Sequence, residues 1–212
     1  MSHKRTEEIV VATTNRGKIV EIQKILSGSP YEFVPITQFD AHFFVEEDGM
    51  SYAENAIKKA RRAALTSGKI ALADDSGLEV DALGGAPGIY SARFGGEDLP
   101  FSEKIARLLR EMDGQVQRTA RFRCVIAVAS PKGTVASSEG VCEGVIAAEP
   151  RGTNGFGFDP IFWVPAYQKT MAELWAEIKN EISHRARALR HVPALIEQVL
   201  AAADPVAASL SI

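Results

Sequence analysis

The order of apolar and amphipathic segments in the first third of the chain constrains the fold most. Short apolar runs, typical of buried strands, alternate with segments whose apolar residues recur at helical spacing. The predicted strands are Ile9–Thr13, Tyr31–Ile36 and Ile70–Ala73. The predicted helices lie between them, one ended by Gly28 and the other running from Ser51 to Ser67 before Gly68. Alternation of strands and helices favours an α/β fold.

The rest of the chain predicts a hairpin and further helices. Arg121–Ala129 and Val135–Ala147 are strand-like runs joined by a turn sequence, and Phe101–Met112 is helical. We expect a last helix from Ile182 to Ala202 with a break near Pro193. These segments together predict an α/β protein with a mixed β-sheet, helices packed around it, and two lobes with a cleft between them. We expect a single domain over residues 1–212, with frayed ends at 1–7 and 204–212.

Composition excludes several classes of protein. The 212 residues carry 24 Lys and Arg against 27 Asp and Glu, a net charge of −3, which argues against a nucleic-acid binder. No apolar run approaches the roughly 20 residues of a membrane span, and the first residues are charged, unlike a signal peptide. Cys124 and Cys142 are expected to be reduced core residues rather than a disulfide. We therefore expect a cytoplasmic protein without a membrane partner.

Several common catalytic motifs are missing. Gly17–Lys18 and Gly68–Lys69 are each followed by Ile, so neither completes a P-loop. Pro160 takes the place of the third glycine of a dinucleotide-binding fingerprint. There is no H-E-x-x-H, no C-x-x-C and no G-x-S-x-G, which excludes the zincin and serine hydrolase patterns.

Two polar clusters lie next to predicted helices. Thr13–Lys18 connects a strand to a helix start, where unpaired backbone N–H groups attract anions and Lys18 adds positive charge. The same residues also fit an ordinary helix capped by Asn15. Glu46–Asp48 precedes the next helix, with Lys58 and Lys59 further along it. These acidic residues could equally do no more than favour the helix dipole.

Two further clusters point to chemistry. Asp74 and Asp75, expected at the exit of a strand, would repel each other unless a cation or a base role compensates them, and Mg²⁺ is the usual partner of carboxylates facing phosphates. Gly155–Pro160 contains glycines for close backbone approach, Phe156 for stacking and Asp159 to accept ring N–H groups. Ser183 is either part of this cluster or only the N-cap of the last helix, followed by an exposed first turn.

Taken together, the clusters suit a nucleoside triphosphate, and their motifs resemble the inosine triphosphate pyrophosphatases. The matching stretches are ATTNRGK, EEDGMSYAENAIKKA, ALADDSGLEVDALGGAPGIYSARF, GTNGFGFDPIF and AELWAEIKNEISHRARAL. They span residues 12–189 in the family order. The resemblance implies an elongated, two-lobed α/β fold with a mixed sheet, flanking helices and a central active-site cleft, and a homodimer. It also implies Mg²⁺-dependent hydrolysis of dITP, ITP and XTP to the monophosphate and pyrophosphate. Phe158 stands where a Tyr is common in the family.

The resemblance also implies a role for individual residues. Asp75 matches the general base, and Glu47, Asp75 and the nearby Asp74 match the metal ligands. The residues matching substrate contacts are Thr13, Thr14, Asn15, Arg16, Gly17, Lys18, Lys59, Ser76, Phe156, Gly157, Phe158, Asp159, Lys179, His184 and Arg185. Our hypothesis is that water activated by Asp75 attacks the α-phosphorus. The Gly84–Phe94 loop also matches the family but has no assigned role; a cleft wall and a dimer contact are both open for it.

Three other functions remain open on the sequence alone. One is a pyrophosphatase for pyrimidine or methylated nucleotides with a similar site. A second is a regulator that binds nucleotides without turning them over, although every charged position required for hydrolysis is present. A nucleic-acid binder has the least support, because there is no basic run with interleaved aromatic residues.

Overall fold

The computed structural model describes residues 7–203 and contains a mixed sheet with flanking helices. Within these residues the sheet has seven strands in the order β2-β1-β3-β4-β5-β6-β7. The strands β1, β2 and β3 run parallel, while β6 is antiparallel to β5 and to β7. The strands are β1 (Glu7–Val11), β2 (Tyr31–Pro35), β3 (Ala71–Val80), β4 (Thr119–Ala129), β5 (Val135–Ile146), β6 (Phe162–Val164) and β7 (Lys169–Thr170). The predicted α/β fold with a mixed sheet is confirmed.

Six α-helices accompany the sheet in residues 7–203. They are α1 (Arg16–Ile25), α2 (Tyr52–Ser67), α3 (Phe101–Glu111), α4 (Ala176–Ile182), α5 (His184–Leu189) and α6 (Val192–Ala203). Short 3-10 helices, of which η3 (Gly88–Arg93) is the longest, fill the connections in the described part of the chain. In residues 7–203 the longest α-helix, α2, has 16 residues, and none of the helices could span a membrane.

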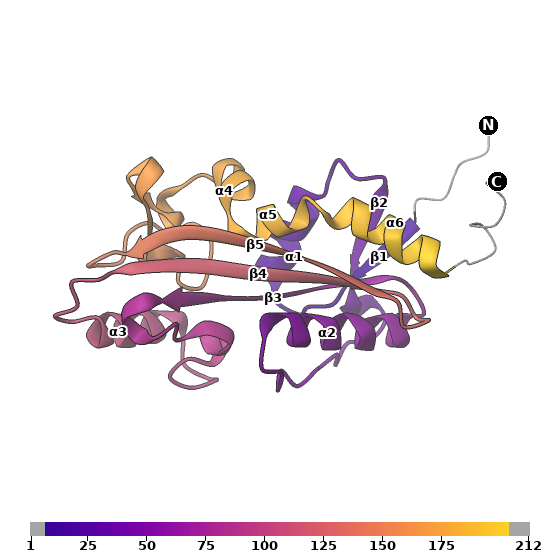
Figure 1. Cartoon of the computed structure of the whole chain (residues 1–212), viewed down its shortest axis with the longest axis horizontal. Coiled ribbons are helices and arrows are strands. Elements are labelled where there is room, and N and C mark those ends of the chain that lie inside the picture. Colours follow the sequence, from indigo (N-terminus) through magenta and orange to yellow (C-terminus); the bar gives the residue numbers. More distant parts are fainter. Residues whose placement is uncertain (1–6, 204–212) are drawn as a thin grey trace. The chain divides into compact units, whose positions relative to one another are not determined.

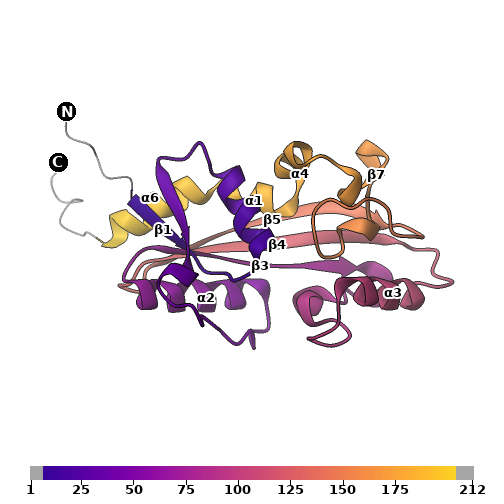
Figure 2. The ribbon, with the colours of Figure 1, turned by 180° about the vertical axis from the view of Figure 1, so that it is seen from behind.

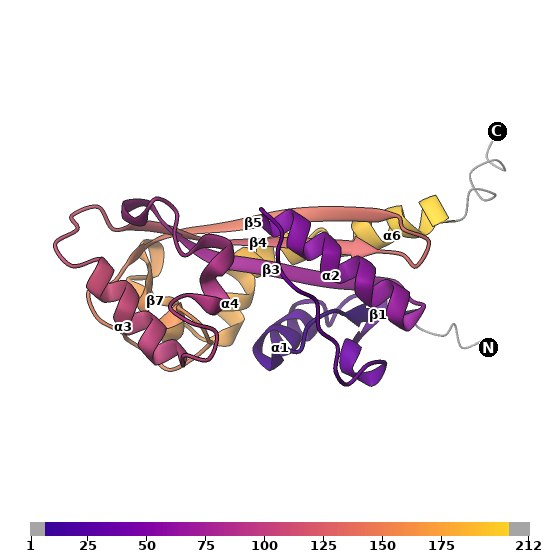
Figure 3. The ribbon, with the colours of Figure 1, turned by 90° about the horizontal axis from the view of Figure 1, so that it is seen from below.

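The chain divides into two compact units, and β3, β4 and β5 contribute to both. Unit 1 holds the residues up to Asp75, Val125–Glu139, and those from Ala188 onward. Within unit 1, α2 lies on one side of these strands and α6 on the other (Figure 1), and a view from below shows α2 in front of the strands (Figure 3). Unit 2 comprises Ser76–Cys124 and Gly140–Arg187, with α3 and α4 on opposite sides of its strands (Figure 2).

Three predicted boundaries are wrong for physical reasons. Glu7, expected in a frayed end, is the first residue of β1; residues 1–6 and 204–212 lie outside the described part. β3 does not end at Ala73 but continues through both aspartates to Val80. The last helical region does not begin at Ile182, which ends α4, and it breaks at Ser183. The predicted break near Pro193 is confirmed, since α5 ends at Leu189 and α6 begins at Val192, and Pro193 itself lies in the first turn of α6, where its missing N–H is tolerated.

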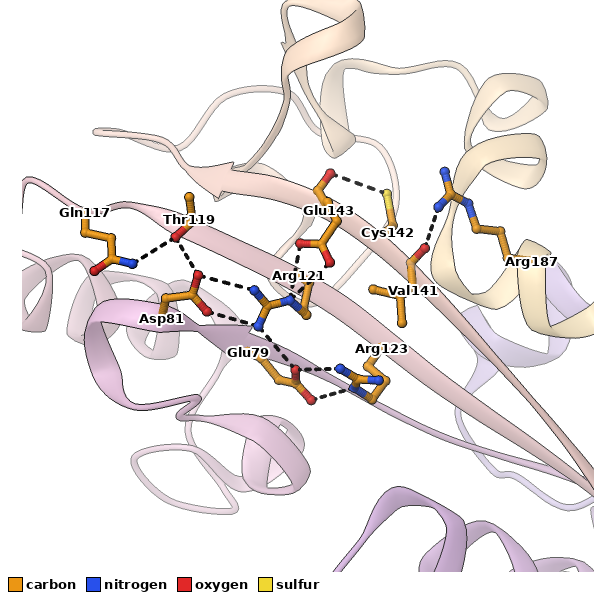
Figure 4. Close-up of polar contacts among 10 residues, drawn as sticks. All are labelled: Glu79, Asp81, Gln117, Thr119, Arg121, Arg123, Val141, Cys142, Glu143 and Arg187. Carbon is orange, nitrogen blue, oxygen red and sulfur yellow. Dashed lines mark hydrogen bonds and ion pairs between the residues drawn. The ribbon is translucent and has the colours of Figure 1, made fainter.

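Along β4 in unit 2, successive side chains point alternately to a charged face and to the core, as expected for a β-strand. In β4, Phe122 and Cys124 are buried, whereas Arg121 and Arg123 lie on the opposite face. Figure 4 shows these two arginines among the carboxylates of Glu79 in β3, Asp81 just after β3, and Glu143 in β5. Arg123 Nε lies 2.8 Å from Glu79 Oε1, and Arg121 pairs with Asp81 and Glu143. These side chains are mostly only partly exposed but remain in contact with solvent, where ion pairs add little stability, so their main effect is to favour one register among the three strands.

Both cysteines have reduced thiols inside the protein, as predicted. Cys124 and Cys142 are buried, on β4 and β5. Burial raises the pKa of the Cys142 thiol, because the thiolate loses solvation there. A protonated and covered thiol is a poor nucleophile, so Cys142 acts as a core residue.

A buried lysine organises the connection between η3 and α3. Lys104 of α3 is 1% exposed, and its Nζ donates to the carbonyl oxygens of Ala92 at 2.6 Å and Gly96 at 2.8 Å. Its ammonium also lies 5.6 Å from the ring centroid of Phe101. A buried ammonium is stable only when several acceptors satisfy it, so this lysine and these carbonyls depend on one another.

We expect Lys104→Met to lower the free energy of unfolding by about 1–3 kcal/mol, because the carbonyls of Ala92 and Gly96 lose the buried ammonium that donates to them. Urea denaturation measures the change. Lys169→Met is the control, since Lys169 is exposed on β7 and its loss should change stability by less than about 0.5 kcal/mol. Equal effects of the two substitutions would contradict a special role for Lys104.

Candidate active site

Two adjacent carboxylates lie inside β3, and each is neutralised by a lysine from a different helix. The side chains of Asp74 and Asp75 are 0% and 6% exposed. Lys18 of α1 forms an ion pair with Asp74, and Lys59 Nζ of α2 lies 2.8 Å from Asp75 Oδ1. Successive side chains of a strand point to opposite faces, which explains why neighbouring aspartates meet two different helices. The lysines make it possible to bury both charges.

Lys59 holds three oxygen atoms around its ammonium. Its Nζ lies 2.5 Å from Glu47 Oε1, 2.8 Å from Asp75 Oδ1, and 2.8 Å from the carbonyl oxygen of Asp74. An ammonium carries three N–H donors, which matches these three acceptors. The small, buried residues Ala56 and Ala60 lie on the same stretch of α2 and allow close packing. The structure therefore brings together Glu47, Asp74 and Asp75 through one lysine.

Asn55 belongs to this cluster, and the sequence analysis missed it. It is fully buried one turn before Lys59, and its Nδ2 lies 3.5 Å from Asp75 Oδ2. Its Oδ1 accepts the backbone N–H of Gly49 at 2.9 Å. A Cβ at position 49 would lie 2.7 Å from this Oδ1, so only glycine fits there. The signal in the sequence was the i, i+4 spacing of Asn55 and Lys59 on the alanine face of the helix.

The charges in unit 1 perturb one another. Burial raises the pKa of the Asp75 carboxyl above its usual range, and the neighbouring Glu47 adds to this, although Lys59 and Lys18 oppose it. Burial alone would lower the pKa of Lys59, but the carboxylates of Asp75 and Glu47 outweigh it, so its pKa is raised. A carboxylate with a raised pKa is a stronger base than an exposed one, which suits proton abstraction from water.

The segment Thr13–Lys18 lies between β1 and α1, as predicted. Asn15 caps α1, because its Oδ1 accepts the backbone N–H of Lys18 at 3.2 Å. Thr13 Oγ1 accepts the N–H of Asn15 at the same distance. Thr14, Asn15 and Arg16 are exposed at this helix start, where anions are favoured. The helix-cap interpretation is confirmed, and contacts of Thr13–Lys18 with phosphates stay a prediction.

The oxygen atoms around Lys59 Nζ are of the kind that Mg²⁺ prefers. Two carboxylates, from Glu47 and Asp75, and the Asp74 carbonyl converge on one cationic point. No group of three or more acidic, His or Cys side chains suited to a metal occurs within residues 7–203. Since Mg²⁺ commonly uses one or two carboxylates and takes its other ligands from water and substrate phosphates, the residues present fit it.

Unit 2 gathers the aromatic and basic residues predicted to recognise a base. The Phe156 ring has two cations over it, Lys179 Nζ at 4.9 Å and Arg185 Cζ at 5.4 Å. Asp159 Oδ2 accepts the backbone N–H of Phe156 at 2.9 Å and also pairs with Lys179. Asp159 therefore shapes the loop that presents Phe156. Gly155 has a φ of +73°, in the left-handed region that favours glycine.

Arg185 and His184 are buried, so the alternative interpretation of an exposed helix turn is wrong. Arg185 is 2% exposed and its Nη2 lies 3.1 Å from Ser76 Oγ, while the His184 ring stacks on Phe122 with centroids 4.7 Å apart. Ser183 does cap α5, since its Oγ accepts the N–H of Ala186 at 3.2 Å. Phe122, a partner of His184, was not predicted because strand periodicity alone marks it as a core residue.

The side chain of Phe158 lies in the core rather than in the group around Phe156 that is predicted to bind the base. It is 2% exposed and packs edge-on against Phe101 at 5.5 Å and Phe94 at 6.3 Å between centroids. Next to it, Gly157 is half-buried, with a φ of +67°. The Gly84–Phe94 loop, which had no predicted role, therefore supplies through Phe94 part of the packing beneath the 155–160 loop.

The predicted site residues thus form one group in each unit. Unit 1 brings together Lys18, Glu47, Lys59, Asp74 and Asp75 around paired charges. Unit 2 brings together Ser76, Phe156, Asp159, Lys179 and Arg185. Lysines beside carboxylates suit a phosphorylated ligand, and an aromatic ring beside arginine suits a planar one. The fold is therefore that of an α/β protein with a group of paired charges in one unit and an aromatic, basic group in the other.

Comparison with known proteins identifies the family. The sequence profile of the Ham1 family matches residues 9–194, and the chain belongs to this family. A "dITP/XTP pyrophosphatase" from Desulforamulus reducens is 52% identical over 194 residues, 91% of this chain and 96% of that protein. Structures of Ham1 proteins from Coxiella burnetii and Staphylococcus aureus, each 43% identical, have TM-scores of 0.83 and 0.81. They cover 91% of this chain and 100% and 99% of their own. The resemblance inferred from the sequence motifs is confirmed.

We expect Gly155→Ala to destabilise the protein by about 1–3 kcal/mol more than Gly114→Ala. Both glycines have left-handed φ, +73° and +70°, so both substitutions strain the backbone similarly. A Cβ at 155 would also lie 2.0 Å from Asp159 Oδ2, whereas nothing lies within 4 Å of one at 114. Urea denaturation of both variants measures the difference, and equal losses would show that the 155–160 loop yields freely.

Proposed function

We propose that this protein hydrolyses non-standard purine nucleoside triphosphates, namely dITP, ITP, XTP and dXTP, to the monophosphate and pyrophosphate. The observation that carries the proposal is the buried pair Asp74–Asp75 with its two lysines in unit 1. The family and the name "dITP/XTP pyrophosphatase" of a 52% identical relative support the substrate class. A protein with this activity removes such nucleotides from the precursor pool.

In the proposed reaction Asp75 takes a proton from water while the water oxygen bonds to the α-phosphorus. The bond from that phosphorus to the bridging oxygen breaks, and pyrophosphate leaves with the electron pair. Lys18 and Lys59 neutralise phosphate charge, and Thr13, Thr14, Asn15, Arg16 and Gly17 line the anion-favouring helix start. Glu47 and Asp75, with Asp74 close by, would hold Mg²⁺, which lowers the charge on the phosphate oxygens.

Base recognition is assigned to the residues of unit 2. Hypoxanthine and xanthine carry an acceptor oxygen at the purine 6-position, to which Arg185 or His184 can donate. Adenine carries an amino group there and would leave that donor unpaired, at a cost of about 1–3 kcal/mol. Arg185 is oriented for this by Ser76 and lies over Phe156, whose ring would stack on the base. Lys179 and Asp159 keep the Phe156 loop in place, with Gly157 and Phe158 completing it.

Two finer expectations belong to this proposal. A homodimer is implied by the family resemblance, and a cytoplasmic location is expected from the composition and the cysteines. The reduced, buried cysteines are compatible with the cytoplasmic location. Sedimentation of the purified protein tests the first.

The proposed activity is tested by measuring pyrophosphate release from dITP, XTP, dGTP and dATP, each with Mg²⁺ and with EDTA. We expect fast release from dITP and XTP only with Mg²⁺, and far slower release from dGTP and dATP. Fast release from pyrimidine or methylated nucleotides instead would change the substrate class. Nucleotide binding without release from any of them would identify a regulator.

We expect Asp75→Asn to lower kcat for dITP by roughly 10²–10⁴-fold, the usual contribution of a general base, because the amide cannot accept the proton. Asp113→Asn is the control, since Asp113 is exposed at the end of α3 and far from these charges in sequence. Thermal unfolding checks that both variants are folded. Turnover of Asp75→Asn close to that of the control would remove Asp75 from the catalytic role.

A further inference from the structure

The ammonium of Lys59 lies among the oxygen atoms of the candidate metal ligands. Its Nζ lies 2.5 Å from Glu47 Oε1 and 2.8 Å from Asp75 Oδ1, with the Asp74 carbonyl oxygen also at 2.8 Å. These are contact distances for an ammonium. An ammonium and a metal ion cannot both sit among the same three oxygens, since each needs direct contact with them and the two repel each other.

The surroundings of Lys59 show that this pairing is a built feature of unit 1. The lysine side chain is 9% exposed, and that of Asp75 is 6% exposed. Asn55, fully buried one turn earlier on α2, lies with its Nδ2 3.5 Å from the other oxygen of Asp75. The neighbouring lysine provides a contrast: Lys58 pairs with Asp48 at the surface, where the two side chains are 42% and 59% exposed. Of these two neighbouring lysines, Lys59 pairs with the proposed metal ligands Glu47 and Asp75, whereas Lys58 pairs with Asp48.

We propose that Lys59 is an internal competitor of the divalent cation. Lys59 must leave Glu47 and Asp75 before a divalent cation binds them, and the phosphates of the substrate then give its ammonium a new partner. This inference rests on the metal site of the proposed function. The flexible four-carbon stem of lysine allows such an exchange without a movement of α2.

The exchange predicts how metal and substrate affect one another. A divalent cation alone has to displace Lys59 into solvent from buried partners, so it binds weakly. A triphosphate offers the displaced ammonium an anion, so the two ligands favour each other's binding. Linkage requires the coupling to be reciprocal. Lys59 would thereby keep the metal site closed to cations that arrive without a nucleotide.

The test measures Mn²⁺ binding without nucleotide, from the loss of the free-ion electron paramagnetic resonance signal. We expect Lys59→Met to bind Mn²⁺ on the order of tenfold or more tightly than the wild-type protein, because the competing charge is gone. An unchanged or weaker affinity in Lys59→Met would overturn the proposal. Lys59→Gln is a second neutral variant, whose amide still donates to the buried oxygens, in case Lys59→Met does not fold.

Two controls locate the effect. Lys58→Met removes the same charge one residue away and should change Mn²⁺ affinity less than twofold. A gain equal to that of Lys59→Met would show that net charge alone causes the effect, which would overturn the proposal.

Glu47→Gln should weaken Mn²⁺ binding in the Lys59→Met background, as expected if the ion sits at these carboxylates. An unchanged Mn²⁺ affinity in that double variant would also overturn the proposal. Since no turnover is measured, failure of the competition and failure of the pyrophosphatase activity are separate outcomes.

Discussion

Burying two adjacent carboxylates in the middle of β3 is the constraint on which the rest of unit 1 depends. Alternation along the strand directs Asp74 and Asp75 to opposite faces, so no single neighbour can neutralise both. The structure meets this with Lys18 from α1 and Lys59 from α2. The positions of both helices against β3 are therefore tied to charge pairing as well as to apolar packing. Leaving either carboxylate without its lysine would cost about 3–5 kcal/mol, a large share of the stability of a domain.

The same constraint explains what could and could not be predicted from the sequence. The alternating pattern predicted the α/β fold and the hairpin of β4 and β5 correctly. It placed the end of β3 at Ala73, because two aspartates in succession are typical of a loop and depleted in strands. Only the tertiary partners Lys18 and Lys59 allow the strand to continue to Val80. Local propensity fails at the place where the candidate chemistry is concentrated, as expected when function opposes local preference.

In unit 2 the sequence predicted which residues matter, but not which of them face the substrate and which support the loop. Asp159 was expected to accept hydrogen bonds from a base, yet its Oδ2 accepts the Phe156 N–H and pairs with Lys179. Phe158 was expected at the substrate, but it packs on Phe101 and Phe94. A motif such as GFGFDP contains both residues that face the ligand and residues that hold those in place. The motif alone does not show which residue has which role. The separation requires knowledge of which side chains are buried and against what.

The position of Lys59 follows from two opposing requirements on one group of oxygens. A site that binds a divalent cation has to collect carboxylates, but collected carboxylates destabilise the folded protein whenever no cation is bound. Placing a lysine among them neutralises the charge before any ligand arrives. The same lysine then weakens binding of a cation that comes alone, since it must first be displaced. Lys59 therefore raises the stability of the protein without metal and lowers its affinity for the metal. A substrate that carries its own anionic charge relieves the opposition, because it gives the displaced ammonium a partner.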